Sequence, residues 1–336
     1  MSSLDSSSSL SERKLNKQED CSKIILFDFV CNSQSSLHSD KARNDHHQLL
    51  SLLKKKISTP KGVSFPLATY SSIDAVQSLP TDFFSYEVKI LYKYNAILLG
   101  GNNKTFYLLD IDTRKVKQII AVEGLRGNCF HVEECAIDGQ DYIYVTSCNL
   151  IKYNLTMLIQ GKSSHECLVW RSDYQLPNSW GVANFKNDVY VCDFEKGLLR
   201  FEKSNGKFIS LNRGNGMYGV AFTPEDEMIL SHADHFEQRL EIHTMNQNGE
   251  WILRNVKKNS ETNIFMDPYS IFYEPITQYI YVSDCTNGKI VVLDKLSLNV
   301  VKNIEGLSMN YAIGVDKRNG NLYVCTGNGG TLHWIH

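Results

Sequence analysis

The sequence predicts an all-β fold, a six-bladed β-propeller with four-stranded antiparallel blades, on two observations. One theme recurs six times after residue 85: an aromatic residue, a small or polar residue and a β-branched residue open a set of short apolar runs. The openings lie 38 to 51 residues apart, which is the length of one four-stranded blade. The six openings are Tyr86-Glu87-Val88, Phe130-His131-Val132, Trp180-Gly181-Val182, Tyr218-Gly219-Val220, Tyr269-Ser270-Ile271 and Tyr311-Ala312-Ile313.

The runs within each repeat have the pattern of β-strands. Tyr279-Ile280-Tyr281-Val282-Ser283 is typical, because it is rich in aromatic and β-branched residues and alternates with a period of two. This alternation excludes a helical solenoid. Asn-Gly pairs, which favour tight hairpins, separate several runs. These pairs are Asn205-Gly206, Asn248-Gly249, Asn287-Gly288 and Asn319-Gly320.

The last repeat lacks its outer strand, because the chain ends at His336 directly after a third apolar run. The other repeats place their fourth run shortly before the next aromatic opening. Counting back from Tyr86 by the same distance leads to residues 73–79. An unpaired strand edge invites aggregation, and a closed ring removes it. We therefore predict that residues 73–79 close the ring as the outer strand of the last blade.

The chain is predicted to have three parts. Residues 1–20 are Ser-, Lys- and Glu-rich and predict a disordered tail. Residues 21–70 form an N-terminal extension, with a short apolar strand at 24–30 and a helix at 40–57 whose last turn is cationic. Residues 71–336 form the propeller. The extension either packs on the propeller or serves as a partner-binding arm.

Composition limits the function classes. The formal net charge is −2, and Lys and Arg are dispersed among acids, so we expect no nucleic-acid partner. No run is long and apolar enough to span a membrane, and the amino terminus lacks a signal-peptide core. Nine cysteines occur without CxxC spacing, which favours buried free thiols in a reducing compartment. We expect a cytoplasmic monomer.

The repeat resembles the NHL-type six-bladed propellers and, distantly, the gluconolactonase and regucalcin family. The resemblance lies in phrases such as Trp180-Gly181-Val182-Ala183 and Tyr279-Ile280-Tyr281-Val282-Ser283-Asp284. It implies a ligand site on one rim near the channel. A lactonase would hold a divalent metal with a carboxylate, an Asn and an Asp, for which Glu87, Asn178 and either Asp193 or Asp284 are the available residues. The Asn-Gly that such enzymes carry is not reproduced, because Ser179 follows Asn178.

Candidate binding residues lie where the inner strands open and the second strands end, since up-and-down connectivity brings both to one rim. Glu87 and His131 replace the small second residue of the motif, and could form a proton-transfer pair or part of a metal site. Satisfied polar residues are the alternative for both. The aromatic residues are either interface anchors or packing residues. The candidates are Trp180, Tyr218, Tyr269, Tyr311, Glu87, His131, Asp193, His232 and Asp284.

Three functions are consistent with this rim. The first is a non-enzymatic module that binds a protein or peptide and needs no cofactor. The second is a metal-dependent, lactonase-like hydrolase with its site in the channel. RNA binding, known among NHL-type domains, ranks third because no basic face is evident. The sequence assigns no catalytic residue and no metal ligand, and Asp193 and Asp284 have a structural alternative as acceptors in tight turns.

Overall fold

The computed structural model describes residues 73–76, 79–80, 84–101, 104–122, 129–133, 139–212, 214–234, 237–327 and 331–336. The chain divides into two units, Met1–Phe65 and Pro66–His336, and the described residues belong to the second. The predicted tail (1–20) and extension (21–70) lie outside the described residues.

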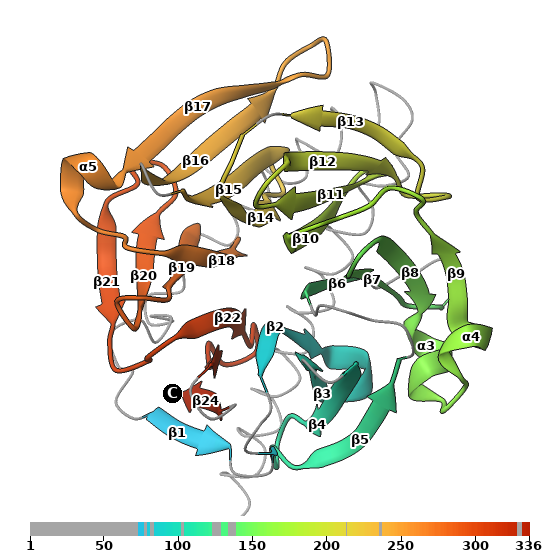
Figure 1. The fold of residues 1–336 in the computed structure, drawn as a ribbon. Helices are drawn as coiled ribbons and strands as arrows, with labels where there is room; N and C mark the ends of the chain where they lie inside the picture. The colour runs from blue at the N-terminus through green and yellow to red at the C-terminus, as the bar shows by residue number, and fades with distance from the viewer. Residues whose placement is uncertain are drawn as a thin grey trace, which may run out of the picture. The chain divides into compact units, whose positions relative to one another are not determined.

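Six four-stranded antiparallel sheets form a ring, so the predicted six-bladed propeller is confirmed (Figure 1). Each blade runs from an inner strand at the channel to an outer strand at the edge. Blade 1 is β2 (Ser85–Leu91), β3 (Ala96–Gly101), β4 (Thr105–Asp110) and β5 (Val116–Ala121). Blade 2 is β6 (Cys129–Glu133), β7 (Tyr142–Thr146), β8 (Leu150–Asn154) and β9 (Leu168–Arg171). Blade 3 is β10 (Ser179–Phe185), β11 (Asp188–Asp193), β12 (Gly197–Glu202) and β13 (Phe208–Asn212).

The remaining blades repeat this order. Blade 4 is β14 (Met217–Phe222), β15 (Glu227–Ala233), β16 (Gln238–Met245) and β17 (Trp251–Lys258). Blade 5 is β18 (Pro268–Glu274), β19 (Tyr279–Asp284), β20 (Lys289–Asp294) and β21 (Val300–Ile304). Blade 6 is β22 (Asn310–Val315), β23 (Leu322–Thr326), β24 (Thr331–Ile335) and β1 (Ile73–Val76).

Short helices occur only in connections of the described chain. They are η3 (Tyr92–Tyr94), α3 (Leu155–Ile159), α4 (Ser164–Cys167) and α5 (Asn259–Thr262). Within the described part of the chain, no helix has the length and apolar character that crossing a membrane requires.

The ring closes through β1, as the sequence predicted. β1 pairs antiparallel with β24, with Ile73 opposite Ile335 and Val76 opposite Leu332. The outer edge of the last blade is therefore supplied by a segment far away in the sequence. The Arg114 guanidinium of blade 1 also lies 3.1 Å from the centre of the Trp334 ring of β24, which ties the first blade to the last.

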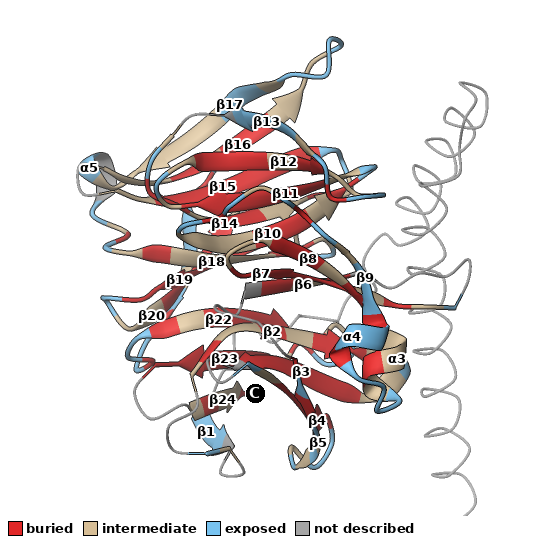
Figure 2. Cartoon of the chain, turned by 45° about the vertical axis from the view of Figure 1, so that its right-hand side comes forward, coloured by how far each residue is buried: buried red, intermediate tan, exposed pale blue. Residues whose placement is uncertain are grey.

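The core lies between neighbouring blades, where the middle strands are buried on both faces (Figure 2). Phe106 of blade 1 and Phe130 of blade 2, for example, meet edge to face at 5.4 Å between ring centres. Burial of such side chains contributes about 25 cal/mol per Å² of apolar surface removed from water. Because the middle strands contact apolar side chains on both faces, polar and apolar residues alternate only weakly at the centres of these strands.

The inner strands of blades 3, 4 and 5 approach one another closely. A Cβ atom on Gly181 would lie 2.4 Å from the Tyr218 carbonyl oxygen, and one on Gly219 would lie 2.5 Å from that of Tyr269. The Ser231 hydroxyl of blade 4 accepts from the Gly219 amide at 2.9 Å and donates to the Tyr269 carbonyl at 2.8 Å, which links two blades. Small residues in these inner strands are therefore a steric requirement of the channel.

Blade 2 departs from the predicted repeat alignment. Phe130 pairs with Val145, just as Val182 pairs with Val191 in blade 3, so Phe130 occupies the third position of the opening motif. His131 accordingly corresponds to Ala183, and the assumption that it replaces Gly181 was wrong. The cause is a longer hairpin connection, residues 134–141, compared with residues 186–187 in blade 3.

Candidate functional site

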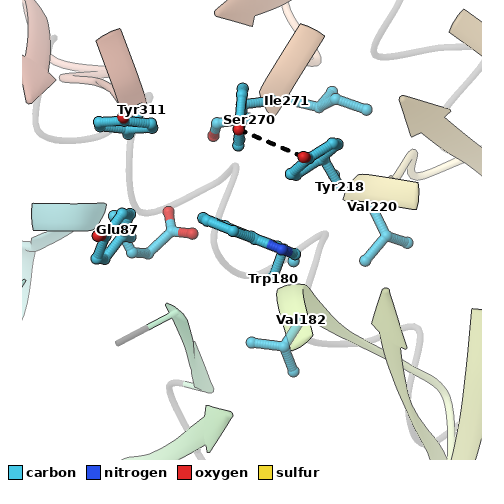
Figure 3. Close-up of a pocket in the computed structure, with 12 residues that line it drawn as sticks. Glu87, Trp180, Val182, Tyr218, Val220, Ser270, Ile271 and Tyr311 are labelled. Carbon is cyan, nitrogen blue, oxygen red and sulfur yellow. Dashed lines mark hydrogen bonds between the residues drawn. The ribbon is translucent and has the colours of Figure 1, made fainter. Parts of the chain in front are cut away.

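Five aromatic rings from five blades close the mouth of the channel. Tyr86, Trp180, Tyr218, Tyr269 and Tyr311 form a continuous cycle in which neighbouring ring centres lie 4.0 to 5.6 Å apart. A further contact at 5.3 Å joins Trp180 to Tyr269 within the cycle. Among them, Trp180, Tyr218 and Tyr311 are seen to point toward one another from separate blades (Figure 3). We call these five residues the aromatic ring.

A β-bulge in the inner strand positions each member of the aromatic ring. The register of β2 against β3 shifts between Ser85 and Glu87, which leaves Tyr86 as the extra residue. A shift occurs at the same place in blades 3, 4, 5 and 6, and the corresponding residues of blade 2, before Cys129, lie outside the described part of the chain. A bulge turns the extra side chain away from the sheet. Phe130, at the third position of the motif like Val182, packs between blades instead.

The aromatic ring leaves little open space in the channel mouth. The cavity lined by its members and by Glu87 has a volume of about 40 Å³. That is room for a few water molecules. The predicted aromatic candidates are thus brought together, but they pack mainly on one another.

Glu87 points into this cavity among apolar side chains that include Val182, Val220 and Ile271 (Figure 3). Burial raises the pKa of Glu87 to about 8, against the opposing effect of the Lys89 cation. The carboxyl group is therefore largely protonated at neutral pH.

His131 lies in a different setting from Glu87. Burial, with a further contribution from the Lys89 cation, lowers the pKa of His131 to about 3, and the side chain hydrogen-bonds to Asn184. His131 is not among the residues that line the cavity. Glu87 and His131 are thus a neutral acid and a neutral base in separate environments, and His131 contacts Asn184 of blade 3. Among the described residues, no group of three or more His, Cys, Asp and Glu side chains is arranged to hold a metal ion.

The two predicted aspartates are buried and hold loops in place. Asp193 accepts the amides of Asn178, Glu195 and Lys196 at 3.0 to 3.1 Å. Asp284 accepts the amides of Met266 and Asp267 at 3.0 and 2.8 Å. Both carboxylates therefore connect the loop before an inner strand to a hairpin turn or strand of the same blade.

The ligand set that a lactonase would need is occupied in other ways. The Asn178 side-chain oxygen accepts from the Trp180 indole at 2.9 Å, and the carboxylates of Asp193 and Asp284 accept backbone amides. These residues do not fit a divalent metal site in their observed geometry.

His232 stands in blade 4 at the register of Asp193 and Asp284. Its side chain is buried, with Nε2 3.2 Å from the Glu241 carboxylate. Glu241 also lies 2.8 Å from His243 Nε2 and 2.6 Å from Arg239 Nε. Although burial opposes it, hydrogen bonds from His232 and His243 hold the pKa of Glu241 below its usual value. His232 therefore belongs to a charge cluster within the packing of blade 4.

A larger groove opens on the same rim beside the aromatic ring. It has a volume of about 560 Å³, within the range of ligand pockets. We call it the rim groove. Its lining comes from the loop before β18, the β19–β20 turn and the β21–β22 connection: Asp267, Tyr269, Cys285, Thr286, Asn287, Gly288, Gly306, Leu307, Ser308, Met309 and Tyr311.

The sequence predicted few of the residues that line the rim groove. Only Tyr269 and Tyr311 belong to the predicted candidates, because the other lining residues lie in loops without a repeated pattern. Met309 has a backbone φ of 52° and is 46% exposed. An exposed apolar residue with left-handed backbone is unusual, and such strain collects at functional sites. A sequence contains no signal for that conformation at a methionine.

Comparisons with known proteins identify the fold alone. No family model matches the chain, and no curated protein matches it. Among solved structures, the β-propeller domain of Cps50 (Swd1) from Myceliophteria thermophila aligns with a TM-score of 0.55 and 10% identity over 79% of this chain and 99% of that domain. The WD40 β-propeller domain of Doa1 aligns with a TM-score of 0.53 and 13% identity over 74% of this chain and 77% of that one. The protein is thus a six-bladed β-propeller whose solved structural neighbours include a WD40 domain.

Proposed function

We propose that the protein is a non-enzymatic binding module that holds a protein or peptide partner in the rim groove. The observation that carries this proposal is the contrast in volume between the rim groove, about 560 Å³, and the channel cavity, about 40 Å³. A ligand of peptide size has room on the rim and none in the channel.

The lining of the rim groove supports a protein partner. Tyr269 and Tyr311 supply aromatic surface of the kind enriched at protein interfaces. Met309, and Met266 beside the groove residue Asp267, are exposed methionines, whose flexible side chains adapt to apolar partners. The fold shared with WD40-type propellers is consistent with an interaction scaffold, and the NHL-type resemblance stays a proposal that rests on the strands of blades 3 and 5.

The other two functions find less support. The oxygen atoms that a lactonase would offer to a metal already accept hydrogen bonds from the protein. RNA binding calls for cations, and the rim groove contains the carboxylate of Asp267 and no Lys or Arg side chain among its lining residues. Neither function is favoured by a particular observation.

Peptide selection would test the proposal. A library of random displayed peptides is selected on the full-length protein, and the selected peptides are measured against Met309→Asp and Ile252→Asp. Met309 and the β17 residue Ile252 are 46% and 50% exposed, so the two changes are matched in exposure. Asp tolerates left-handed backbone better than Met does, so Met309→Asp should keep the fold.

We expect Met309→Asp to weaken the selected peptides at least tenfold, and Ile252→Asp to leave them unchanged. Melting curves of both variants establish that each is folded. Peptides that bind both variants as well as the parent protein, or an absence of any selected peptide, would overturn the proposal.

A further inference from the structure

The rim groove contains one carboxylate without a cationic partner. Asp267 is half-buried, and its Oδ2 accepts from the Thr286 hydroxyl at 3.2 Å. No Lys, Arg or His among the described residues forms an ion pair with it. The neighbouring carboxylate, Asp284, differs in two ways: it accepts two backbone amides and has Lys289 Nζ at 3.9 Å. Of the two acidic groups here, Asp267 is the one available to a ligand.

Aromatic rings lie next to this carboxylate. Tyr269 and Tyr311 line the same groove, with ring centres 5.4 Å apart and planes at 88°. The Tyr269 hydroxyl donates to the Tyr218 hydroxyl at 3.3 Å, and the Tyr311 hydroxyl bonds to Cys285. The hydroxyl groups are therefore engaged inside the protein. What the two rings offer a ligand is π surface, which attracts cations.

An apolar wall completes the groove on the side of the β21–β22 connection. Leu307 is buried, and Met309 is exposed and held in left-handed backbone. A flexible methionine next to two tyrosines suits a long alkyl stem. The groove therefore matches a long basic side chain. The carboxylate and the aromatic rings suit its cation, and the apolar wall suits its alkyl stem.

We infer that the rim groove recognises an arginine or lysine side chain of a partner peptide, with the cation at the Asp267 carboxylate and the stem along Met309. This inference rests on the proposed function and gives it a ligand chemistry. A cation would also compensate the charge of Asp267, with which no described Lys, Arg or His side chain forms an ion pair.

Binding should depend on pH with a defined sign. Burial, and then the Asp284 carboxylate, raise the pKa of Asp267 to about 6, against the Thr286 hydrogen bond that lowers it. A cation binds the ionised carboxylate, so affinity should rise as the pH rises from about 5 to about 7.5. The other charged or titratable groups around Asp267 are Asp284, Lys289, Cys285, Tyr269, Tyr311 and Tyr218. The pKa values of Cys285, Tyr269, Tyr311 and Tyr218 are all raised, so these four stay neutral across this range.

The test uses short Gly-flanked peptides as probes, with a central arginine, lysine, citrulline or glutamate. Citrulline has nearly the shape of arginine without the charge. Binding to the full-length protein is measured by saturation-transfer difference NMR at pH 5 and pH 7.5. The variants are Asp267→Asn and, as a matched control, Asp226→Asn. Asp226 lies in the β14–β15 turn, and its exposed carboxylate pairs with Lys186.

We expect the arginine and lysine probes to bind at least tenfold more tightly than citrulline at pH 7.5, and to lose most of that preference at pH 5. Asp267→Asn should abolish the preference, and Asp226→Asn should keep it. Equal binding of arginine and citrulline, or a preference that survives Asp267→Asn, would overturn the inference.

The two proposals fail in different ways. If the selected peptides need Met309 but contain no required basic residue and are indifferent to Asp267→Asn, the inference is wrong and the proposed function stands. If neither the probes nor any selected peptide binds at the rim, both are wrong.

Discussion

The channel mouth and the rim groove lie side by side and share Tyr269 and Tyr311, yet their side chains are used in opposite ways. In the channel mouth, five aromatic rings contact one another and leave about 40 Å³. In the rim groove, loop residues leave about 560 Å³, an exposed methionine, and a carboxylate that pairs with no cationic side chain of the described residues. The repeated residues build the propeller, and the residues outside the repeat shape the rim groove.

The largest expected effect concerns the close packing behind the channel mouth. Gly219→Val should destabilise the protein by about 3 kcal/mol or more, because a Cβ there would lie 2.5 Å from the Tyr269 carbonyl oxygen. Gly314→Val in blade 6 is the control, since its Cβ would meet the Val88 side chain at 3.2 Å, where the neighbour can move. Denaturant unfolding measures both. Equal losses would show that the inner strands of blades 3 to 5 are no closer than those of blade 6.

Trp180→Ala should cost about 2 kcal/mol, because the indole contacts Tyr86, Tyr218 and Tyr269 and is half-buried. If the aromatic ring is a packing element, peptides selected for the rim groove should bind this variant nearly as well as the parent protein. Thermal melting and peptide titration separate the two effects. A loss of peptide binding without a loss of stability would instead assign the ring to the interface.

A pH-dependent effect should follow from the protonated carboxyl group in the channel. The folded-state pKa of Glu87, about 8, lies above its unfolded value of 4.5, so its contribution to stability is complete below pH 4.5 and is lost as the pH rises toward 8. Glu87→Gln cannot ionise, so its stability relative to the parent should grow through that window and level off above it. Urea unfolding between pH 4 and pH 9 measures the difference. A difference independent of pH would place the Glu87 carboxyl in a solvated site.

The smallest expected effect is at the groove wall. Met309→Gly should raise stability by about 0.5 kcal/mol, because glycine adopts a φ of 52° without strain, and this gain should exceed the loss of contacts by a side chain that is 46% exposed. Leu298 has the same φ but is buried, so Leu298→Gly should destabilise. Peptide binding to Met309→Gly should fall despite the gain in stability. A stabilised variant with unchanged binding would remove Met309 from the partner site.

The sequence predicted much of the fold and part of the rim. The six-blade repeat was sufficient because each blade buries its middle strands in the same way, and the closing strand followed from counting one missing edge. Phe130 was misplaced by two positions because the longer β6–β7 connection hid the true register. Taking Phe130 as the opening residue made the distance to the end of the second strand resemble that of the other repeats. His131 was therefore assigned to the position of Gly181, when it belongs to that of Ala183.

By itself the sequence determined the number of blades, their strand order and a closing strand within residues 73–79, of which residues 73–76 form β1. It could do so because the periodic burial of apolar side chains produces a periodic sequence pattern. The tertiary structure decided which side chains face each other across blades. It packed the aromatic residues on one another by means of β-bulges, and it placed the carboxylates of Asp193 and Asp284 where they accept backbone amides. It also placed Asp267 where no Lys, Arg or His of the described chain forms an ion pair with it. The physical reason is that hydrogen bonding and the volume of a groove depend on contacts between loops of different blades. No local sequence pattern encodes these contacts.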